Sequence, residues 1–570
     1  MIKNKLKNKN SFVEPDEIFL DSKNLQNFDR QQFEGRIERP ISKKTILMLS
    51  ILFLFFTGIF GMRLFYLQIQ KGEINFNRSQ NNILEKTIIF TDRGIIYDRN
   101  KKELVWNKKE NTETEFTVEN TAPNPPTRAY LSPGFSHLLG YVSYPSKDST
   151  GNYWQSDFIG KDGLEKQYNN ILKGENGTKI VETDAFGKIY SENIVNTPKQ
   201  GTDLITTIDA QLQKELFTII KNLSADRTFT GGSGIIMNAI NGEIITTTSF
   251  PEYNSEVLSL GKDVSTINNY LTDKKKVFVD KNISGLYTPG SIVKPFFALG
   301  ALAEGVIDPY KKILSTGSIS IPNPYFLDQK TVFKDWQVNG WTNMMEAIAV
   351  SSDIYFYEIG GGFENQKGLG ITNIEKYAKL FGFGDKTGID LPDEKKGTIP
   401  NPEWKALNFK NDPWRIGDTY HTAIGQYGFQ VTPIEMVRAV ATIANKGKIL
   451  TPHLILNNVE KENQNTILNL NKEYFDIIHQ GMRLAVTSGT AVSLNVPYIQ
   501  VAAKTGTAQV NLAKNKVNSW VIGFFPYQNP KYAFAIMMES GPSTTGSSAA
   551  TSIMRQLLDW MSVNTPEYFK

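Results

Sequence analysis

A serine and a lysine lie three residues apart at Ser291 and Lys294, directly after the segment Tyr287-Thr-Pro-Gly290. Proline and glycine predict a turn there, and the apolar residues beyond Lys294 predict that a helix starts at this point. Positions i and i+3 of a helix share a face, so the hydroxyl and the amine could meet. Burial can lower the pKa of a lysine, which would let Lys294 accept the serine proton. Free backbone N–H groups at the helix start would suit the oxyanion of an acyl transfer.

Two further motifs carry polar groups that fit the same chemistry. Residues Ser351–Asp353 read S-S-D and lie between two helix-compatible segments, where the motif could also be a plain helix cap. Residues Lys504–Gly506 read K-T-G and lie in the strand-like run VAAKTGTAQV. Lysine and threonine there could hold a substrate carboxylate, and Gly506 would let an extended substrate backbone lie close to the strand.

Each short motif has a second match elsewhere in the chain. Residues Ser259–Lys262 also read S-x-x-K, but a glycine inside the match and the lack of an apolar continuation predict a loop. Residues Lys386–Gly388 also read K-T-G, in a glycine-rich turn that predicts a structural role. The motifs at Ser291, Ser351 and Lys504 follow one another in the order that serine acyl transferases with these motifs require, and that order favours them.

The composition excludes several other chemistries. The 570 residues include no cysteine and only four scattered histidines. A cysteine nucleophile and a Cys/His zinc cluster are therefore excluded, and a Ser-His-Asp triad stays possible only in principle. We expect no metal and no organic cofactor. A net charge of +4, from 62 basic and 58 acidic residues, gives no polybasic surface for nucleic acid.

The elements around these motifs predict an α+β domain with an antiparallel sheet. Asn241-Gly242 predicts a β-hairpin, and helices are expected to dominate from about Ser291 to Lys446. The remaining elements of this domain are predicted as strands at Val501–Val510, Trp520–Phe525 and Tyr532–Met538, and as helices at Asp209–Asn222 and Ala550–Met561.

An apolar segment near the N-terminus predicts one membrane span. Residues 45–62 carry no charge, and the apolar character continues to Leu67. This segment is long enough to span a membrane, since a helix needs about 20 apolar residues to cross the hydrocarbon core. A cleaved signal peptide fits poorly, since 44 residues precede the segment and no small-residue cleavage site follows it. Basic residues are denser before the span than after it, so the N-terminus is predicted in the cytoplasm and the rest of the chain outside.

Beyond the three active-site motifs, the sequence resembles a class B penicillin-binding protein of the penicillin-binding protein 2 type, over about residues 45 to 565. The triple S-x-x-K, S-D-N and K-T-G marks penicillin-binding proteins and β-lactamases. Further segments similar to this family are Arg93–Asn100 and Gly160–Glu165 in its pedestal, Asp203–Asp209 before its catalytic domain, and Pro402–Lys405 and Trp414–Thr419, which favour the elongation type.

The resemblance implies a penicillin-binding transpeptidase fold after a β-rich pedestal and a single N-terminal transmembrane helix. The implied divisions are a cytoplasmic tail (1–44), the transmembrane helix (45–67), the pedestal (68–227) and the transpeptidase domain (228–570). The protein would sit in the cytoplasmic (inner) membrane with its catalytic domain on the periplasmic or extracellular side.

The resemblance also implies how the residues act. Ser291 would attack the bond between the terminal D-alanines of a peptidoglycan stem peptide, and Lys294 would take its proton. Ser351 would relay the proton to the leaving amine, while Asp353 and Lys504 tune the lysine charges. Substrate binding would fall to Lys504, Thr505, Gly506 and Thr507, and the backbone N–H groups of Ser291 and Thr507 would hold the oxyanion.

The implied partners are stem peptides ending in D-Ala-D-Ala, β-lactams that acylate the same serine, a SEDS-type (RodA-like) glycan polymerase and other elongation-complex proteins. The alternatives are a septal-type class B transpeptidase, a β-lactamase, and a non-catalytic scaffold or β-lactam sensor. A bifunctional class A enzyme is disfavoured because the segment before the catalytic domain matches pedestal motifs.

Three positions depart from the family pattern. The middle motif ends in Asp353 where the triple has asparagine. The stretch from 101 to 129, which usually forms an outer pedestal head, is short. The family's G-Q-G reads Gly425-Gln-Tyr427-Gly428, a difference that we interpret as structural.

Overall fold

The computed structural model describes residues 42–73, 83–108, 125–149, 151–183, 189–323, 326, 328–462, 464–511, 515–546 and 548–570. The chain divides into two compact units, one of residues 1–84 with 182–191 and one of residues 85–181 with 192–570. The predicted tail lies outside the described residues except for positions 42–44, and so does the segment 109–124 of the short pedestal head. The predicted division at residues 227 and 228 falls inside the second unit and stays a prediction.

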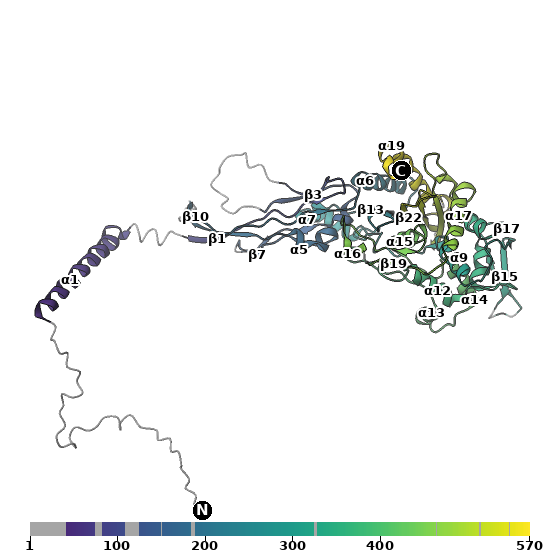
Figure 1. Ribbon diagram of the computed structural model, residues 1–570, viewed down its shortest axis with the longest axis horizontal. Coiled ribbons are helices and arrows are strands. Elements are labelled where there is room, and N and C mark those ends of the chain that lie inside the picture. Colours follow the sequence, from purple (N-terminus) through teal and green to yellow (C-terminus); the bar gives the residue numbers. More distant parts are fainter. Residues whose placement is uncertain are drawn as a thin grey trace, which may run out of the picture. The chain divides into compact units, whose positions relative to one another are not determined.

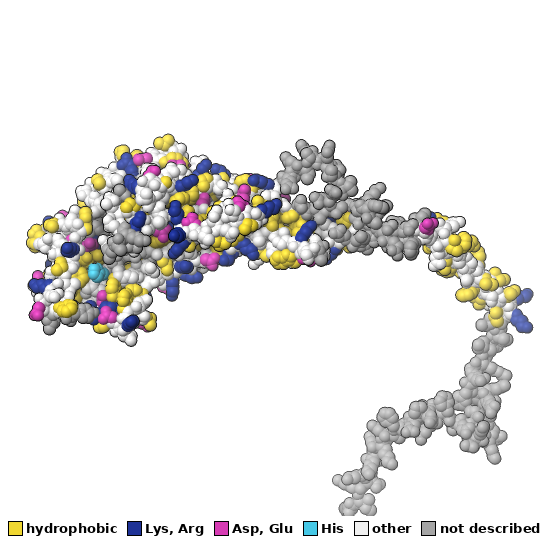
Figure 2. Space-filling model, turned by 180° about the vertical axis from the view of Figure 1, so that it is seen from behind, with side chains coloured by type: hydrophobic (Ala, Val, Ile, Leu, Met, Phe, Trp, Pro, Cys, Tyr) yellow, Lys and Arg dark blue, Asp and Glu magenta, His cyan; other side chains and the backbone are white. Residues whose placement is uncertain are grey.

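The first unit contains a long apolar helix where the sequence predicts a membrane span. Helix α1, Lys43–Phe65, begins at Ser42, whose hydroxyl accepts a hydrogen bond from the backbone N–H of Thr45, and a π-helical turn, Tyr66–Gln70, continues it. Among the described residues, Lys43–Gln70 alone is long and apolar enough to cross a membrane. Its 28 residues would span about 42 Å at 1.5 Å per residue. Apolar side chains surround this helix and are exposed (Figure 2).

The N-terminal part of the second unit is rich in short strands, as predicted for a pedestal. A four-stranded sheet has the order β11-β2-β3-β4, and the parts of β1, β9 and β10 that fall in this unit pair in that order. The short helices α3, α4 and α5 accompany them. The bounds are β1 Ile83–Ile89, β2 Ile96–Tyr97, β3 Glu103–Lys108, β4 Thr127–Tyr130, β9 Gly177–Thr183, β10 Ile189–Asn196, β11 Leu204–Ile205, α3 Ser136–Leu139, α4 Gly163–Gln167 and α5 Asn169–Leu172.

A buried charge cluster joins these pedestal strands to α4. The carboxylate of Glu165 accepts hydrogen bonds from Arg93 Nε at 2.6 Å and Arg128 Nε at 2.8 Å, and all three side chains are almost fully buried. Burial by itself would raise the pKa of Glu165, but Arg128 and Arg93 hold that pKa below its usual range. The two family-like pedestal segments, which contain Arg93 and Glu165, therefore meet in one ion-pair cluster.

A five-stranded antiparallel sheet forms the centre of the C-terminal part, in the order β13-β12-β22-β21-β20. The bounds of its strands are β12 Gly231–Asn238, β13 Ile244–Phe250, β20 Ala502–Asn511, β21 Lys516–Phe525 and β22 Tyr532–Pro542. The predicted hairpin at Asn241-Gly242 is confirmed, and Gly242 has a φ of +98°, which favours glycine. The three predicted C-terminal strands are also confirmed.

Helices cover both faces of this sheet, so it is buried on both sides. Helices α6, Ala210–Asp226, and α19, Ala549–Asn564, pack with residues such as Ile236 and Met538. Helix α15, Pro433–Ala444, packs with the alternate residues, which include Met237 and Ile522. Figure 1 shows β13 and β22 between α6 and α15. Successive side chains along a strand point to opposite faces of the sheet, so neighbouring residues pack into two separate hydrophobic cores.

The segment from Ser291 to Lys446 is mostly helical, as predicted, but the structure adds four short strands to it. These strands form two small antiparallel pairs, β14 with β17 and β15 with β16. Alternation explains the second pair, because Ile319 and Phe333 are buried while their neighbours are more exposed. The bounds are α9 Lys294–Ala303, β14 Ile313–Ser315, β15 Ser318–Pro322, β16 Lys330–Lys334, β17 Gly340–Thr342, α10 Met344–Val350, α11 Asp353–Gly361, α12 Gly370–Leu380, α13 Pro402–Asn408 and α14 Ile416–Ala423.

Candidate active site

Ser291 lies in a tight turn that leads directly into α9. Residues Gly290–Val293 form a 3₁₀ turn, and the α-helix begins at Lys294. Gly290 has a φ of +59°, and its N–H donates to the carbonyl of Gly425 at 3.0 Å. A side chain at Gly425 would collide with the carbonyl of Gly290. The backbones of these two residues therefore pack directly against each other, and this contact supports the turn. The predicted turn followed by a helix start is confirmed.

Lys294 is fully buried and points at the middle motif. Its Nζ donates to Asp353 Oδ1 at 2.6 Å, to the Ser351 carbonyl at 2.8 Å and to Ser351 Oγ at 3.3 Å. Between the two described residues Ser291 and Lys294 no side-chain hydrogen bond is formed. The i and i+3 spacing therefore does not by itself bring the hydroxyl and the amine into contact, because the buried ammonium turns towards the Asp353 carboxylate.

The middle motif lies at a junction of two helices, as the sequence predicts. Helix α10 ends at Val350, Ser351 takes a left-handed conformation with a φ of +60°, and α11 begins at Asp353. Ser352 is the cap of α11, since its hydroxyl accepts a hydrogen bond from the N–H of Tyr355 at 3.3 Å. Left-handed conformations cost a non-glycine residue free energy and cluster at functional sites. The motif is thus both a helix cap and a holder of two polar groups that face Lys294.

Strand β20 brings the second lysine to the same hydroxyl. Lys504 is fully buried, and its Nζ donates to Ser351 Oγ at 2.8 Å and to the carbonyl of Thr505 at 2.8 Å. Burial, and after it the charge of Lys294, hold the pKa of the Lys504 amine well below its usual range, against a smaller opposing effect of Asp353. Burial thus favours the neutral form of the Lys504 amine.

The three residues after Lys504 have different surroundings. Thr505 and Thr507 border the cleft, and the Thr505 hydroxyl donates to Thr490 Oγ1 at 2.6 Å, or accepts from it. A side chain at Gly506 would lie 2.9 Å from Ile292 Cγ2 and 3.0 Å from the Pro289 carbonyl oxygen. Gly506 is thus needed for the close approach of β20 to the turn that carries Ser291, a different reason from the predicted contact with substrate backbone.

One cleft of about 460 Å³ collects these groups. The residues that line it are Ser291, Trp336, Ser351, Asp353, Thr490, Thr505, Gly506, Thr507 and Ser548. Three of them, Trp336, Thr490 and Ser548, were not predicted from the sequence. They lie outside the recognisable motifs, and only the fold brings them to this place. No group of three or more histidine, aspartate or glutamate side chains is placed to hold a metal ion among the described residues.

The two decoy motifs lie elsewhere. Ser259 is buried in the last turn of α7, Ser255–Leu260, and its hydroxyl bonds to Tyr130, so the predicted loop at Ser259–Lys262 is wrong for its first residues. The Gly261 conformation, with a φ of +64°, ends that helix before Lys262. Thr387 lies in an irregular segment after the turn at 381–384, and its N–H and its hydroxyl both donate to Glu394 Oε1 at 2.6 Å, which fits the structural role predicted for Lys386–Gly388.

Tyr427, which stands where the family pattern has a glycine, also has a structural explanation. It has a φ of +61° and its ring stacks on Phe409 with the ring centroids 6.0 Å apart. Trp404 and Trp414 pack edge-on against the same ring. Aromatic packing thus holds a tyrosine in a conformation that usually favours glycine.

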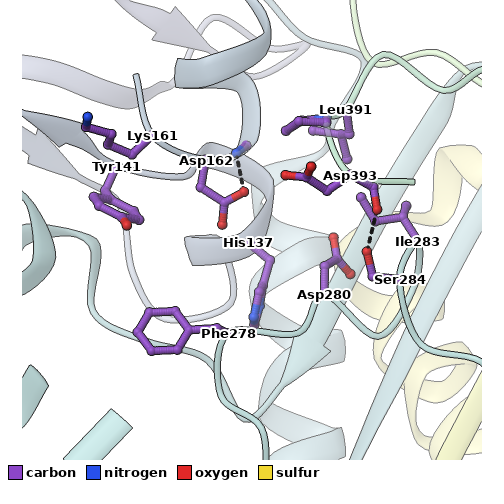
Figure 3. A pocket seen from close by; sticks show the side chains of 12 residues that line it. His137, Tyr141, Lys161, Asp162, Phe278, Asp280, Ile283, Ser284, Leu391 and Asp393 are labelled. Carbon is purple, nitrogen blue, oxygen red and sulfur yellow. Dashed lines mark hydrogen bonds between the residues drawn. The ribbon is translucent and has the colours of Figure 1, made fainter. Parts of the chain in front are cut away.

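A second, smaller cavity of about 230 Å³ shares no lining residue with this cleft. Side chains from the pedestal part, among them His137 and Asp162, face Asp280 and Asp393 from the C-terminal part (Figure 3). The Asp162 carboxylate accepts a hydrogen bond from Tyr253 at 2.8 Å, and burial raises the pKa of Asp280. The Ser284 hydroxyl in this cavity donates to the backbone carbonyl of Asp393 at 2.7 Å.

The chain matches two family models. The penicillin binding protein transpeptidase domain matches residues 232–559, and the penicillin-binding protein dimerisation domain matches residues 121–206. The peptidoglycan D,D-transpeptidase MrdA of Acinetobacter baumannii is 31% identical over 441 residues, which cover 71% of this chain and 62% of that relative. MrdA of Escherichia coli K12 is 27% identical over 617 residues, which cover 91% of this chain and 94% of the relative.

A solved structure has the same fold. The penicillin-binding protein PBP2 of Helicobacter pylori, solved in complex with MreC, matches with a TM-score of 0.69 and 28% identity over 84% of this chain and 99% of that one. The fold and the three motifs at one cleft define a serine transpeptidase of the penicillin-binding kind. The chain belongs to the penicillin-binding protein transpeptidase family, as a class B member of the penicillin-binding protein 2 type.

Proposed function

We propose that Ser291 is the residue through which this chain, a peptidoglycan D,D-transpeptidase of the elongation type, cross-links stem peptides. The observation that carries the assignment is the meeting of the three motifs: Ser351 Oγ lies 3.3 Å from Lys294 Nζ and 2.8 Å from Lys504 Nζ, at the wall of the cleft that Ser291 lines. A serine that shares a cleft with a hydroxyl linking two amines can be activated without histidine.

The hydrogen bonds support a proposal for the state of the two lysines before the reaction. Lys294 donates three hydrogen bonds, which is the full capacity of an ammonium, and one goes to the Asp353 carboxylate. It must give up a proton before it can accept one from Ser291. Lys504, whose pKa is lowered, donates two, which leaves a neutral amine one lone pair. Ser351 touches both amines and offers a path for that proton.

In the acylation step, Ser291 Oγ attacks the carbonyl carbon between the two terminal D-alanines. The C–N bond breaks, and the proton that leaves Ser291 ends on the nitrogen of the departing D-alanine, relayed through Lys294 and Ser351. In the second step an amine of a neighbouring stem peptide attacks the serine ester. It forms a new amide, and a proton from that amine returns to Ser291. A β-lactam would open on the same serine and stay bound.

Backbone and side-chain groups around the cleft serve the two charges of the substrate. The N–H groups of Ser291 and Thr507 are the proposed oxyanion donors, which lower the barrier by electrostatic stabilisation. Thr505 and Thr507, which border the cleft, and Lys504 are the proposed partners of the terminal carboxylate. Gly506 contributes by letting the strand approach the Ser291 turn.

We also propose the topology and the partners. Residues 45–67 would anchor the protein in the cytoplasmic membrane, with residues 1–44 inside and the pedestal (68–227) and transpeptidase domain (228–570) outside. The long exposed apolar helix at Lys43–Gln70 supports a single span. A SEDS-type (RodA-like) polymerase and other elongation proteins are the proposed partners. The H. pylori PBP2 solved in complex with MreC supports a partner protein in general, and the polymerase rests on the family resemblance.

Labelling with a fluorescent penicillin tests the nucleophile. The full chain should take up one label, Ser291→Ala none, and Ser259→Ala, from the decoy motif, as much as the unchanged chain. Label on Ser291→Ala would contradict the assignment. Rapid release of hydrolysed penicillin with continued turnover would favour a β-lactamase over a transpeptidase.

A further inference from the structure

Asp335 concentrates more polar contacts than any residue of the three motifs among those described here. It directly follows β16, and its carboxylate accepts six hydrogen bonds. Oδ1 accepts from the N–H groups of Trp336 at 2.8 Å and Asp353 at 3.0 Å. Oδ2 accepts from Ser352 Oγ at 2.8 Å, Ser315 Oγ at 3.0 Å, Asn339 Nδ2 at 3.1 Å and the N–H of Ile354 at 3.2 Å.

Three of these contacts fall on the start of α11. The first N–H groups of a helix have no partner inside the helix, and a negative charge is favourable there. The carboxylate takes the N–H groups of Asp353 and Ile354 together with the hydroxyl of Ser352. It therefore fixes three consecutive residues directly after Ser351, and the first residue of the helix is the one that pairs with Lys294.

The residue after Asp335 touches the other end of the same junction. The indole N–H of Trp336 donates to the carbonyl of Val350 at 3.2 Å, and Trp336 lines the cleft although its side chain is largely exposed. Asp335 and Trp336 thus hold the Ser351 junction from both sides, at Val350 and at residues 352–354. Ser351 needs such support because its left-handed conformation is unfavourable for a serine.

We infer that Asp335 is a positioning residue of the acyl transfer, which holds Ser351 and Asp353 in register with Lys294 and Lys504. The inference rests on the proposed roles of those residues. Asp335 exchanges no proton and touches no substrate. Its effect comes from geometry, since a misplacement of about 1 Å in catalytic groups can cost about 100-fold in rate.

The test separates the binding of penicillin from the acylation that follows it, in the full chain by stopped flow. We expect Asp335→Ala to lower the first-order acylation rate by about 100-fold and to leave the dissociation constant of the non-covalent complex within about threefold. In Asp335→Asn the amide N–H₂ would face the N–H of Ile354, so we expect an intermediate loss, on the order of tenfold. This variant decides the question if Asp335→Ala does not fold.

Asp209→Asn is the matched control. Asp209 caps α6 with its carboxylate, accepts from Gln211 and Leu212 and also receives the hydroxyl of Tyr568, but it lies outside the cleft. The substitution Asp209→Asn should lower the melting temperature without changing the acylation rate. An unchanged acylation rate in folded Asp335 variants, or an equal loss in Asp209→Asn, would overturn the inference. Labelling of the Ser291→Ala variant by penicillin would instead exclude Ser291 as the nucleophile. Failure of the proposed function can therefore be told apart from failure of the inference about Asp335.

Discussion

The amines of Lys294 and Lys504 meet at one oxygen, the hydroxyl of Ser351, which lies 3.3 Å from the first and 2.8 Å from the second. Two charged amines so close together and fully buried would repel each other strongly. The structure resolves this conflict by pairing Lys294 with Asp353 at 2.6 Å and by lowering the pKa of Lys504 through burial and the charge of Lys294. The Ser351 hydroxyl thus links an amine that is paired with a carboxylate to an amine whose neutral form is favoured by burial.

Removal of the shared hydroxyl should therefore slow acylation strongly. We expect Ser351→Ala to lower the rate of acylation by penicillin by about 100-fold or more, the usual contribution of a positioned proton donor or acceptor. The fold should persist, because the cap of α11 is Ser352 and not Ser351. Stopped-flow acylation with a melting curve on the same sample checks both statements. An acylation rate close to that of the unchanged chain would exclude the relay through Ser351.

The lowered pKa of Lys504 predicts how acylation depends on pH. Only the neutral amine can accept a proton, so acylation should rise as pH rises through the lowered pKa and then level off. A chain with Lys504→Arg, whose guanidinium stays charged, should be inactive over the whole range. The pH dependence of the acylation rate measures this. Equal activity of the arginine variant at high pH would show that Lys504 does not act as an acceptor.

Burial of Lys504 also predicts a conflict between stability and activity. A lysine whose pKa is depressed in the fold binds fewer protons there than in the unfolded chain, so its contribution to stability falls as pH falls towards the depressed pKa. Lys504→Met keeps most of the volume and removes this cost. We expect it to stabilise the protein by about 1 kcal/mol at neutral pH and to abolish acylation, as measured by denaturant unfolding and penicillin labelling.

The sequence could predict much of this site because each motif carries a local signal. Pro289-Gly290 indicates the turn before Ser291, and the strand-like run VAAKTGTAQV around Lys504 indicates a strand. Both elements are confirmed. The partners of Lys294 could not be predicted, because they depend on where α11 packs and not on the i and i+3 spacing. Asp335 could not be predicted for the same reason, because a single aspartate after a short strand belongs to no motif and gains its six contacts only in the fold.

The close contact between the backbones of Gly425 and Gly290 predicts that a side chain at Gly425 slows acylation. This residue has a φ of +74°, and a side chain there would collide with the carbonyl of Gly290, next to Ser291. Gly425→Ala should displace the turn and lower acylation at least about tenfold. Gly305→Ala is the control, because Gly305 has a φ of +60° but open space around it, and it should cost only about 1 kcal/mol of stability. Similar acylation rates for the two variants would contradict the role of this contact.

The buried pair of arginines around Glu165 predicts acid sensitivity of the pedestal. Removal of one partner of a buried ion pair leaves the others uncompensated, so Glu165→Gln should destabilise this part by about 3 kcal/mol or more. The pKa of Glu165 is lowered in the fold, so the pair stabilises the protein above the unfolded pKa of about 4.3 and this stability is lost as pH falls through the folded pKa.

Thermal unfolding between pH 7 and pH 3 tests this expectation, with Glu175→Gln as the matched control. Glu175 pairs with Lys199 at 2.8 Å, but both side chains are exposed, so the control should unfold at nearly the same temperature as the unchanged chain. At pH 7 the Glu165 variant should unfold well below both, and towards pH 3 the difference should shrink because the unchanged chain loses the same ion pairs. A constant difference at all pH values would mean that the charge of Glu165 contributes nothing and that only its packing matters.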